Sequence, residues 1–467
     1  MLFSSMVFIW IFLPLSLAGN YLFYNIGSVK AADYFLLAVS LFFYAWGEPV
    51  YILLMLAVIT VNWLSGMALS VCSRKKLILV LCIVADLGIL GYFKYAGMLV
   101  GTVNALFHTN LETPQIMLPV GISFFTFQAL SYVADVYRKE AKVQKNWFRL
   151  ALYISFFPQL IAGPIVRYAD IDRQIESRTI SACQTASGIR RFLYGFAKKV
   201  LLANVLGSCA DVLYSISIDN VTGVMVWVAS VAYTLQIYYD FSGYSDMAIG
   251  LGRMFGFEFK ENFHYPYMSH SIREFWRRWH ISLGSWFREY VYIPLGGSRK
   301  GTGRTYLNLI LVFARTGFWH GASWTFVFWG LFHGCFLVLE RIGLGKVLGK
   351  SKAVSWLYCM VVVHVGWVFF RTENLKNSIR YLSRMLQPWK YTHSSYSVFE
   401  FVSIKMIVVI ALGILGAGMI QWIGERAGIR SRWKNSWAEI ICCAGMFFLA
   451  LLSLASGTYN PFIYFRF

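Results

Sequence analysis

Long apolar stretches recur along the whole chain and are separated by short polar loops. Uncharged runs at 1–24, 50–73, 316–339, 353–370 and 406–424 are each long enough to cross a bilayer as a helix. Shorter or once-charged apolar runs lie between them. The pattern therefore predicts an all-α, polytopic membrane protein with about ten to twelve membrane helices, some of them short or re-entrant.

The middle of the chain departs from this pattern. Between about 188 and 345 the apolar runs are interrupted by polar stretches that are rich in glycine and proline, such as "ENFHYPYMSHSIREFWRRWH" and "YIPLGGSRKGTGR". Irregular backbone at membrane depth is tolerated only where it is buried in protein or lines a wet cavity. We therefore expect a functional site in this region, within a single membrane domain that spans residues 1–467.

Composition agrees with a membrane location. Hydrophobic residues make up 58% of the chain, its mean hydropathy is +0.57 and its net charge is +20. Most basic residues lie in loops that we predict to be cytoplasmic, so the positive-inside rule accounts for the charge better than an anionic partner does. We expect contact with membrane lipid and none with nucleic acid.

The positive-inside rule also predicts an orientation. The basic segments 73–76 and 138–149 are expected to face the cytoplasm, and 99–117, whose only charge is Glu112, is expected to face outward. Three helices before residue 73 then place the N-terminus outside. Both 371–390 and 425–434 are basic although only one clear helix separates them, which predicts a half-membrane or interfacial segment there.

The most unusual stretch is "REFWRRWHISLGSWFREYVYIPLGG" at residues 273–297. As one continuous helix it would be amphipathic, with Trp276, Trp279 and His280 on the apolar face and Arg277 among the arginines opposite. We interpret it as an interfacial helix whose arginines lie near phosphate groups. On this segment alone, His280 is better explained as a satisfied core histidine than as a functional one.

A second histidine lies in the middle of an apolar stretch, where an ionisable group is costly. In "FARTGFWHGASWTF", Gly317 and Gly321 predict a local break around His320, and Ser323 is a plausible N-cap for a helix that starts at Trp324. A helix N-terminus and nearby Arg315 would both favour a neutral imidazole that can act as a base. The alternative is a histidine bonded to a carbonyl of a neighbouring helix.

Other catalytic arrangements fit the sequence less well. There is no HExxH or other compact metal-ligand spacing, no Walker A sequence and no GxSxG elbow. The eight cysteines show no CxxC spacing and fall mostly inside apolar runs, so we expect neither a zinc site nor a disulfide framework. A buried base without an obvious protein nucleophile suits direct transfer of an activated acyl group to a hydroxyl.

Several segments resemble the membrane-bound O-acyltransferases, in particular the bacterial alginate O-acetyltransferase branch. The resemblance rests on "FWRRWHISLGSWFREYVYIPLGGSRKG" and "GFWHGASWTFVFWG", and extends to "VGISFFTFQALSYVADVYR", "FFPQLIAGPIVRY", "YYDFSGYSDMAIGLGRMFGF", "ENFHYPY" and the terminal "YNPFIYFRF". It implies that His320 and His280 are the catalytic histidines, lining a central tunnel through the helical bundle. It also implies a multi-pass protein of the bacterial cell membrane.

The resemblance further implies a cytoplasmic acyl-thioester donor such as acetyl-coenzyme A, with no bound cofactor or metal. The acceptor is expected on the outer face, as a polysaccharide or a partner protein that acetylates it. As substrate- or donor-binding residues we predict Arg299, Lys300, Arg304, Arg277, Trp276, Trp279 and Arg315. The "GGSRKGTGR" loop is equally well explained as an ordinary positive-inside loop.

Asp240 and Asp246 in "DFSGYSD" are predicted to orient a histidine or to hold the fold, and the structural role is favoured. Two other functions remain as alternatives. The same fold would support D-alanyl transfer to teichoic acid from a carrier protein. A transporter or flippase would also have broken helices, but it should show paired repeats and midplane charges, which we do not find in this sequence.

Overall fold

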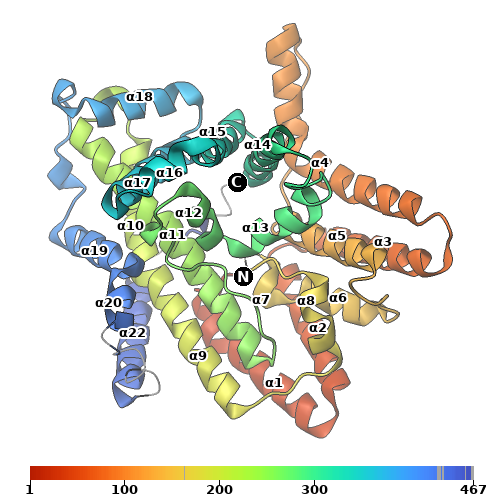
Figure 1. Cartoon of the computed structure of the whole chain (residues 1–467). Helices are drawn as coiled ribbons and strands as arrows, with labels where there is room; N and C mark the ends of the chain where they lie inside the picture. Colours follow the sequence, from red (N-terminus) through yellow and green to blue (C-terminus); the bar gives the residue numbers. More distant parts are fainter. Residues whose placement is uncertain (162, 427, 429–432, 434–435, 458, 464–467) are drawn as a thin grey trace. The chain divides into compact units, whose positions relative to one another are not determined.

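The computed structural model describes residues 1–161, 163–426, 428, 433, 436–457 and 459–463 (Figure 1). These residues form helices and connecting loops, and no strand occurs among them. The predicted all-α class is therefore confirmed. The end of the "YNPFIYFRF" segment and Ala162 of "FFPQLIAGPIVRY" lie outside the described residues.

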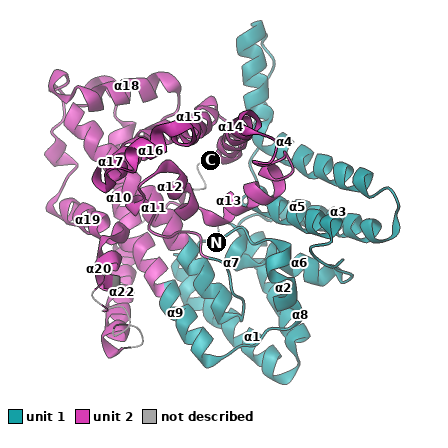
Figure 2. Cartoon of the chain, in the orientation of Figure 1, with its two compact units in different colours: residues 1–192, 245–260 teal, residues 193–244, 261–467 magenta. Residues whose placement is uncertain are grey.

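The chain forms two compact units, and each combines two separate stretches of sequence (Figure 2). Unit 1 comprises Met1–Phe192 and Ser245–Lys260, so the boundary falls within two helices, α9 (Ala182–Ala197) and α11 (Gly223–Met254). Its remaining helices are α1 (Leu13–Ile26), α2 (Val29–Ala45), α3 (Tyr51–Val71), α4 (Lys75–Phe107), α5 (Ile122–Arg138), α6 (Trp147–Ser155), α7 (Phe157–Leu160) and α8 (Tyr168–Glu176). Three helices precede residue 73, as predicted.

Unit 2 comprises Leu193–Tyr244 and Glu261–Phe467. Its helices are α10 (Asn204–Ser215), α12 (Ile272–Arg278), α13 (Ile281–Phe287), α14 (Thr302–His320), α15 (Trp324–Leu339), α16 (Gly345–Leu348), α17 (Lys352–Arg371), α18 (Leu375–Leu386), α19 (Ile404–Ile414), α20 (Ile420–Arg426) and α22 (Trp437–Ser456). All the predicted site residues except Asp246 belong to this unit.

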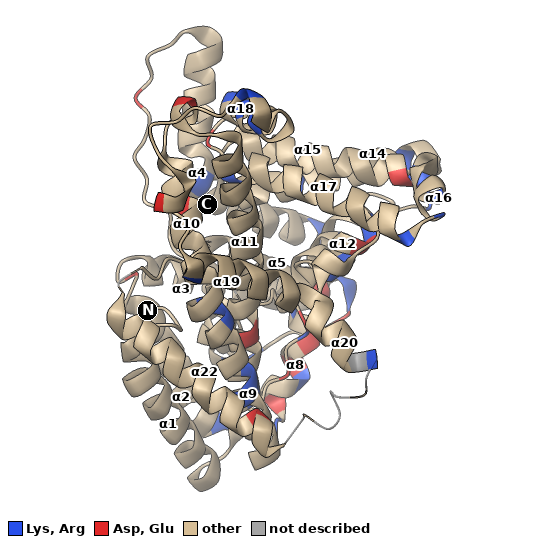
Figure 3. Cartoon of the chain, turned by 90° about the vertical axis from the view of Figure 1, so that its left-hand side faces the viewer, with Lys and Arg blue, Asp and Glu red and all other residues tan. Residues whose placement is uncertain are grey.

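Seven helical segments of the described chain are long and apolar enough to cross a membrane. They are Phe8–Ile26, Tyr51–Val71, Lys75–Phe107, Trp324–Leu348, Lys352–Arg371, Ile404–Gly424 and Trp437–Ser456. Large apolar side chains on them are exposed, for example Leu53, Val84 and Ile441, as expected for surfaces that face lipid. Helices α1 and α22 carry almost no charge along their length (Figure 3). These helices confirm the polytopic membrane class; the total of ten to twelve and the tunnel remain predictions.

The basic segment 371–390 contains the separate helix α18, whose twelve residues are too few to cross a bilayer. One face of α18 is buried and includes Tyr381 and Met385, while Ile379 and Leu386 are exposed. This short amphipathic helix agrees with the predicted interruption of the membrane pattern. The second basic segment, 425–434, lies largely outside the described residues.

Helix α11 forms the centre of the unit 2 core. Its residues from Ala229 to Tyr244 are almost all buried, because apolar and small side chains occur on every side of the helix. Large aromatic residues of other helices pack in the same core, and Trp329 and Trp367 are the largest fully buried side chains in it. The wall of the candidate site is therefore aromatic.

Helices α14 and α15 form a tight hairpin at glycine positions. A Cβ atom on Gly317 would lie 2.1 Å from the carbonyl oxygen of Phe326, and one on Gly330 would lie 2.2 Å from that of Phe313. Only glycine permits this approach, as in other close helix pairs in membranes. Gly317 therefore serves helix packing inside α14, and the predicted break around His320 occurs at Gly321, where α14 ends. The close packing holds the end of α14 beside Trp329.

Candidate active site

A small enclosed cavity in unit 2 contains one of the predicted histidines. Its volume is about 10 Å³, which is room for about one water molecule. It is lined by Ile237, Phe241, Trp279, His320, Trp329, Trp367, Phe370 and Ile463. Among these residues His320 is the one with an ionisable side chain, so any acid–base chemistry in the cavity depends on it.

His320 is the last residue of α14 and is 6% exposed. Aromatic rings enclose its imidazole, with centroid distances of 4.9 Å to Trp319, 5.3 Å to Trp329 and 5.2 Å to Phe370. Three rings fix the imidazole in place and keep bulk water away from it. An ionisable group held so firmly in an apolar wall is a typical candidate for catalysis.

As expected, His320 lies just before the start of α15 in sequence, but it is the last residue of α14 and not part of the N-terminus of α15. Ser323 does cap α15, since its side chain accepts a hydrogen bond from the Thr325 amide. His320, however, belongs to the preceding helix, which ends at Gly321 in an extended conformation. The end of a helix presents unsatisfied carbonyl groups and the negative end of its dipole. The dipole argument for a neutral imidazole therefore does not apply to α14.

His280 lies at a break between two short helices. It has φ of 46° and ψ of 53°, and it separates α12 from α13. The predicted continuous amphipathic helix over 273–297 is therefore wrong, because the chain turns at His280. The turn carries the histidine into the protein interior, where it is 2% exposed. Its ring meets Phe241, a residue of the cavity wall, edge-on at a centroid distance of 4.5 Å.

Asn262 holds the turn at His280 and was missed by the sequence analysis. Its backbone oxygen accepts from the Ile281 amide at 2.9 Å. Its side-chain Oδ1 lies 3.1 Å from His280 Nδ1 and accepts from both the amide and the hydroxyl of Ser282, at 3.2 and 2.9 Å. The "ENFHYPY" segment, which contains Asn262, was part of the family resemblance, but the sequence alone assigned no role to this asparagine.

The two histidines are electrostatically coupled. Burial lowers the pKa of His280 well below its ordinary value, and the nearby His320 lowers it further. His280 lies outside the candidate membrane-spanning helices. A lowered pKa keeps its imidazole neutral at physiological pH, so it can accept a proton or a hydrogen bond. The structure thus brings the two predicted histidines into one electrostatic site.

The two predicted tryptophans have different positions. Trp279 is buried, lines the cavity and packs against Trp367 at a centroid distance of 4.8 Å. Trp276 does not line the cavity; its ring instead contacts Trp329 and His333, at 5.4 and 5.0 Å. Trp279 therefore forms part of the cavity wall, while Trp276 packs against Trp329, which is another residue of that wall.

The five predicted basic residues do not line the cavity. Arg277, Arg299, Lys300, Arg304 and Arg315 are all exposed. The loop that carries Arg299 and Lys300 is held by Asn308, whose side-chain amide donates to the carbonyls of Leu295 and Gly297 at 3.4 and 2.9 Å. These positions fit recruitment of an anionic ligand from solvent, and not contact with reacting atoms.

The two aspartates pair with basic residues. Asp246 lies in unit 1 and forms an ion pair with Arg191 at 2.6 Å. Asp240 lies in unit 2, where it pairs with buried Lys199 at 2.6 Å and accepts a hydrogen bond from the Ile463 amide at 2.8 Å. Because Ile463 lines the cavity, the Asp240–Lys199 pair holds the C-terminal segment against the site. Among the described contacts, neither aspartate orients a histidine.

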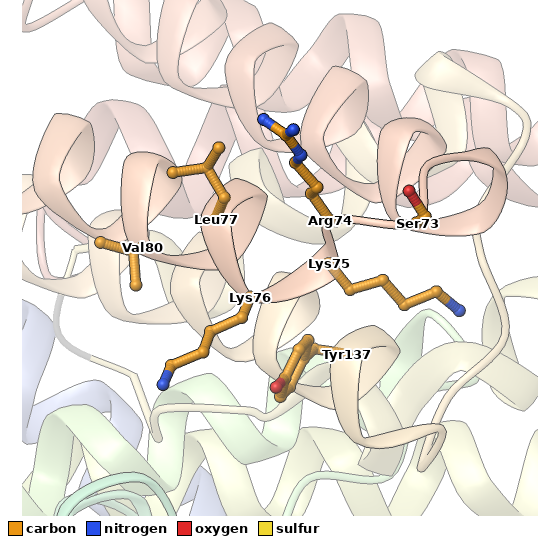
Figure 4. Close-up of a pocket in the computed structure, with 7 residues that line it drawn as sticks. All are labelled: Ser73, Arg74, Lys75, Lys76, Leu77, Val80 and Tyr137. Atoms are coloured by element: carbon orange, nitrogen blue, oxygen red, sulfur yellow. The ribbon is translucent and has the colours of Figure 1, made fainter.

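A larger groove lies in unit 1, and none of the predicted site residues lines it. Its volume is about 780 Å³, and it is lined by Ser73, Arg74, Lys75, Lys76, Leu77, Val80 and Tyr137 (Figure 4). The side chains of Lys75 and Lys76 extend on either side of Tyr137, and the arginine points the other way. These residues include the basic loop 73–76. No histidine, aspartate or glutamate lines this groove, so we place the candidate active site at the histidine cavity.

Comparison with known proteins identifies the family of the chain. Residues 139–370, which include both histidines, match the membrane-bound O-acyltransferase family. The chain is 37% identical to the probable alginate O-acetylase of Pseudomonas putida, over the whole of both chains. It is 34% identical to the peptidoglycan O-acetyltransferase of Helicobacter pylori, over 86% of this chain and 83% of that protein.

The chain is more distantly similar to the teichoic acid D-alanyltransferase of Bacillus subtilis, with 26% identity over 57% of this chain and 71% of that protein. These relatives share the transfer of an acyl group, and the helical membrane fold agrees with them. The chain belongs to the membrane-bound O-acyltransferase family, and its likeness is to the alginate O-acetylase type.

Proposed function

We propose that this enzyme transfers an acetyl group from acetyl-coenzyme A on the cytoplasmic side to hydroxyl groups of an extracytoplasmic polysaccharide. The transfer is direct, or it passes through a partner protein that acetylates the polymer. The names of the full-length relatives, which act on alginate and on peptidoglycan, support a polysaccharide acceptor. The membrane helices support a site that both sides can reach, and a bacterial cell membrane is the proposed location.

The observation that carries the proposal is the buried pair of His320 and His280 at an aromatic cavity. In the proposed reaction the acceptor hydroxyl oxygen attacks the thioester carbonyl carbon, while His320 takes the hydroxyl proton as general base. The tetrahedral intermediate then collapses, the carbon–sulfur bond breaks, and the proton passes from His320 to the departing thiolate. Ester and free thiol are the products, and no bound cofactor or metal is needed to balance the step.

The aromatic wall favours transfer to a hydroxyl over hydrolysis. A cavity of about 10 Å³ admits about one water molecule and is too small for an acetyl thioester. Substrate binding therefore requires the side chains around His320 to move, and the bound substrates then replace the water. This exclusion of water protects the thioester during transfer.

Acetyl transfer is favoured over the D-alanyl alternative. Identity to the alginate-type relative is 37% over the whole chain, whereas identity to the D-alanyltransferase is 26% over about half of it. The interrupted helices were the feature that a transporter or flippase would share. In a member of an acyltransferase family, they are explained by the site that they build.

We predict that the loop before α14 and the first turn of this helix recruit the donor through their charge. Replacing Arg299, Lys300 and Arg304 together by Gln is expected to raise the apparent KM for acetyl-coenzyme A, while turnover at saturating donor falls much less. Exposed cations attract the phosphates of coenzyme A but do not touch the reacting atoms, so they bind the ground state and the transition state alike. Steady-state kinetics in membrane vesicles measure both constants.

The matched control replaces Lys346, Lys350 and Lys352 by Gln, which removes the same charge from another exposed stretch of unit 2. This control is expected to leave the KM near that of the wild-type enzyme. Added salt should imitate the loop variant, because screening acts within about 8–10 Å at ordinary ionic strength. If the loop variant keeps its KM and only changes its insertion, the loop is a topological signal and not a donor site.

A further inference from the structure

Asn262 is fixed by hydrogen bonds from both its backbone and its side chain. Its carbonyl accepts from the Ile281 amide, and Oδ1 accepts from the Ser282 amide and hydroxyl and lies 3.1 Å from His280 Nδ1. Asn262, His280 and Ser282 are buried, with Asn262 only 1% exposed. Their contacts converge on Asn262 Oδ1, and the Ser282 hydroxyl also lies 3.4 Å from His280 Nδ1.

These contacts determine which ring nitrogen of His280 carries the proton. The backbone amide of Ser282 is always a donor, so the Asn262 atom that it meets has to be the carbonyl oxygen. An oxygen of this kind accepts and does not donate. His280 Nδ1 must therefore be the donor in the contact with Asn262, and in a neutral imidazole the other nitrogen, Nε2, then has a bare lone pair.

The surroundings of His280 favour the neutral ring. Among the described residues none forms a hydrogen bond with His280 Nε2, although this atom is buried. A protonated Nε2 would leave a buried donor unsatisfied, which is costly. The titratable group that acts on His280 is His320. Its ring neighbours on the other elements, Phe241 and Trp319, are uncharged.

We propose that Asn262 is a positioning residue for acyl transfer, because it holds His280 as the Nδ1-protonated tautomer with a free lone pair on Nε2. In this role the lone pair accepts a hydrogen bond from the attacking hydroxyl group while His320 removes the proton. Phe241, which contacts the His280 ring, and Trp279, its neighbour in sequence, both line the cavity. The inference rests on the proposed function of the two histidines.

The first test is Asn262→Asp, which keeps an oxygen acceptor but adds a negative charge beside Nδ1. A carboxylate stabilises the imidazolium, so it raises the pKa of His280. The neutral ring then exists only above this higher pKa. The acid limb of the pH–activity profile is therefore expected to move to higher pH, with activity recovered in alkaline buffer. A purely structural role for Asn262 would lower activity at every pH without moving the limb.

Two further variants separate positioning from folding. Asn262→Leu removes the acceptor and is expected to lower kcat by about 10- to 100-fold with little change in donor KM, as is typical for groups that orient a reactive imidazole. Ser282→Ala removes the hydroxyl, which lies 3.4 Å from His280 Nδ1, but keeps the Asn262–His280 contact and adds no charge, so its acid limb should move far less than that of Asn262→Asp. Asn146→Asp is the matched control, since Asn146 Oδ1 also accepts from a backbone amide, that of Phe148, and none of its hydrogen bonds in the described structure involves a histidine.

The tautomer is also observable directly. Nitrogen NMR of ¹⁵N-histidine-labelled protein, with the His280 signals assigned by loss in His280→Asn, distinguishes a protonated from a bare ring nitrogen. We expect a proton on Nδ1 and none on Nε2 in the wild-type protein. This measurement needs no substrate, so it decides the inference even if Asn262→Asp does not fold or the wild-type protein transfers no acetyl group.

The two kinds of failure are therefore distinct. Absence of acetyl transfer by the wild-type protein counts against the proposed function, whatever the tautomer. A wild-type protein that transfers acetyl but carries the proton on Nε2 overturns the role of Asn262. The role is equally overturned if folded Asn262→Asp keeps the wild-type acid limb.

Discussion

Replacing His320 by Ala is expected to lower acetyl transfer by about 10²- to 10⁴-fold, the usual loss when a general base is removed. The imidazole is the ionisable side chain in the cavity wall, and three aromatic rings hold it in place. Donor binding should change little, because the variant keeps the exposed loop cations. The loss should therefore appear in turnover, measured as ester-linked acetyl in cell-envelope polysaccharide of a deletion strain that expresses the variant.

His364→Ala provides the matched control for this loss. His364 is another histidine of unit 2, but its ring nitrogens lie 2.8 and 3.0 Å from the hydroxyls of Ser230 and Thr234, and it does not line the cavity. This control should retain most of the activity when expression is matched. Near-normal acetylation by folded His320→Ala would instead mean that this histidine is a structural part of the aromatic core.

The second large effect is expected for His280→Asn, with a loss of about 10- to 100-fold in kcat. Asparagine tolerates the left-handed backbone at this position, so the change removes the imidazole without adding backbone strain. In the wild-type enzyme the pKa of His280 lies below its ordinary value, and activity should therefore persist to lower pH than an exposed histidine would allow. Protonation of His280 at still lower pH removes the lone pair, and activity falls.

The Trp279→Ala variant serves as the comparison for His280→Asn. Trp279 precedes His280 and packs in the aromatic core, so its removal tests folding more than chemistry. Full activity of His280→Asn together with unfolding of Trp279→Ala would assign this segment to the core alone. Thermal unfolding of the detergent-solubilised protein, measured as the loss of monodispersity on heating, distinguishes a folding defect from a catalytic one.

The sequence predicted the fold class well, because membrane helices are local features. Apolar runs of about 20 residues and capping residues such as Ser323 are visible without knowledge of tertiary contacts. The histidines were also identifiable, since ionisable side chains within apolar stretches are rare unless they serve a function. Family resemblance then assigned the chemistry that these features alone left open.

The local geometry of the site was less predictable. The pattern around His280 reads as one amphipathic helix, and the turn there depends on contacts from Asn262, eighteen residues earlier in the chain. Gly317 looked like a helix break, yet it remains helical because α15 packs against it. The favoured structural role of Asp240 agrees with its ion pair, but nothing in the sequence indicated that its partner would be Lys199, about forty residues away. Long-range contacts of this kind leave no periodic signal.

The most direct test of the central claim follows the fate of the acetyl group. Everted membrane vesicles that contain this protein expose their cytoplasmic face, so [¹⁴C]acetyl-coenzyme A reaches the proposed donor side. We predict that the label enters a product from which mild base releases it, as expected for an ester, and that His320→Ala vesicles with equal protein show little of it. Equal base-labile label in wild-type and His320→Ala vesicles, or none above vesicles that lack the protein, would contradict the account.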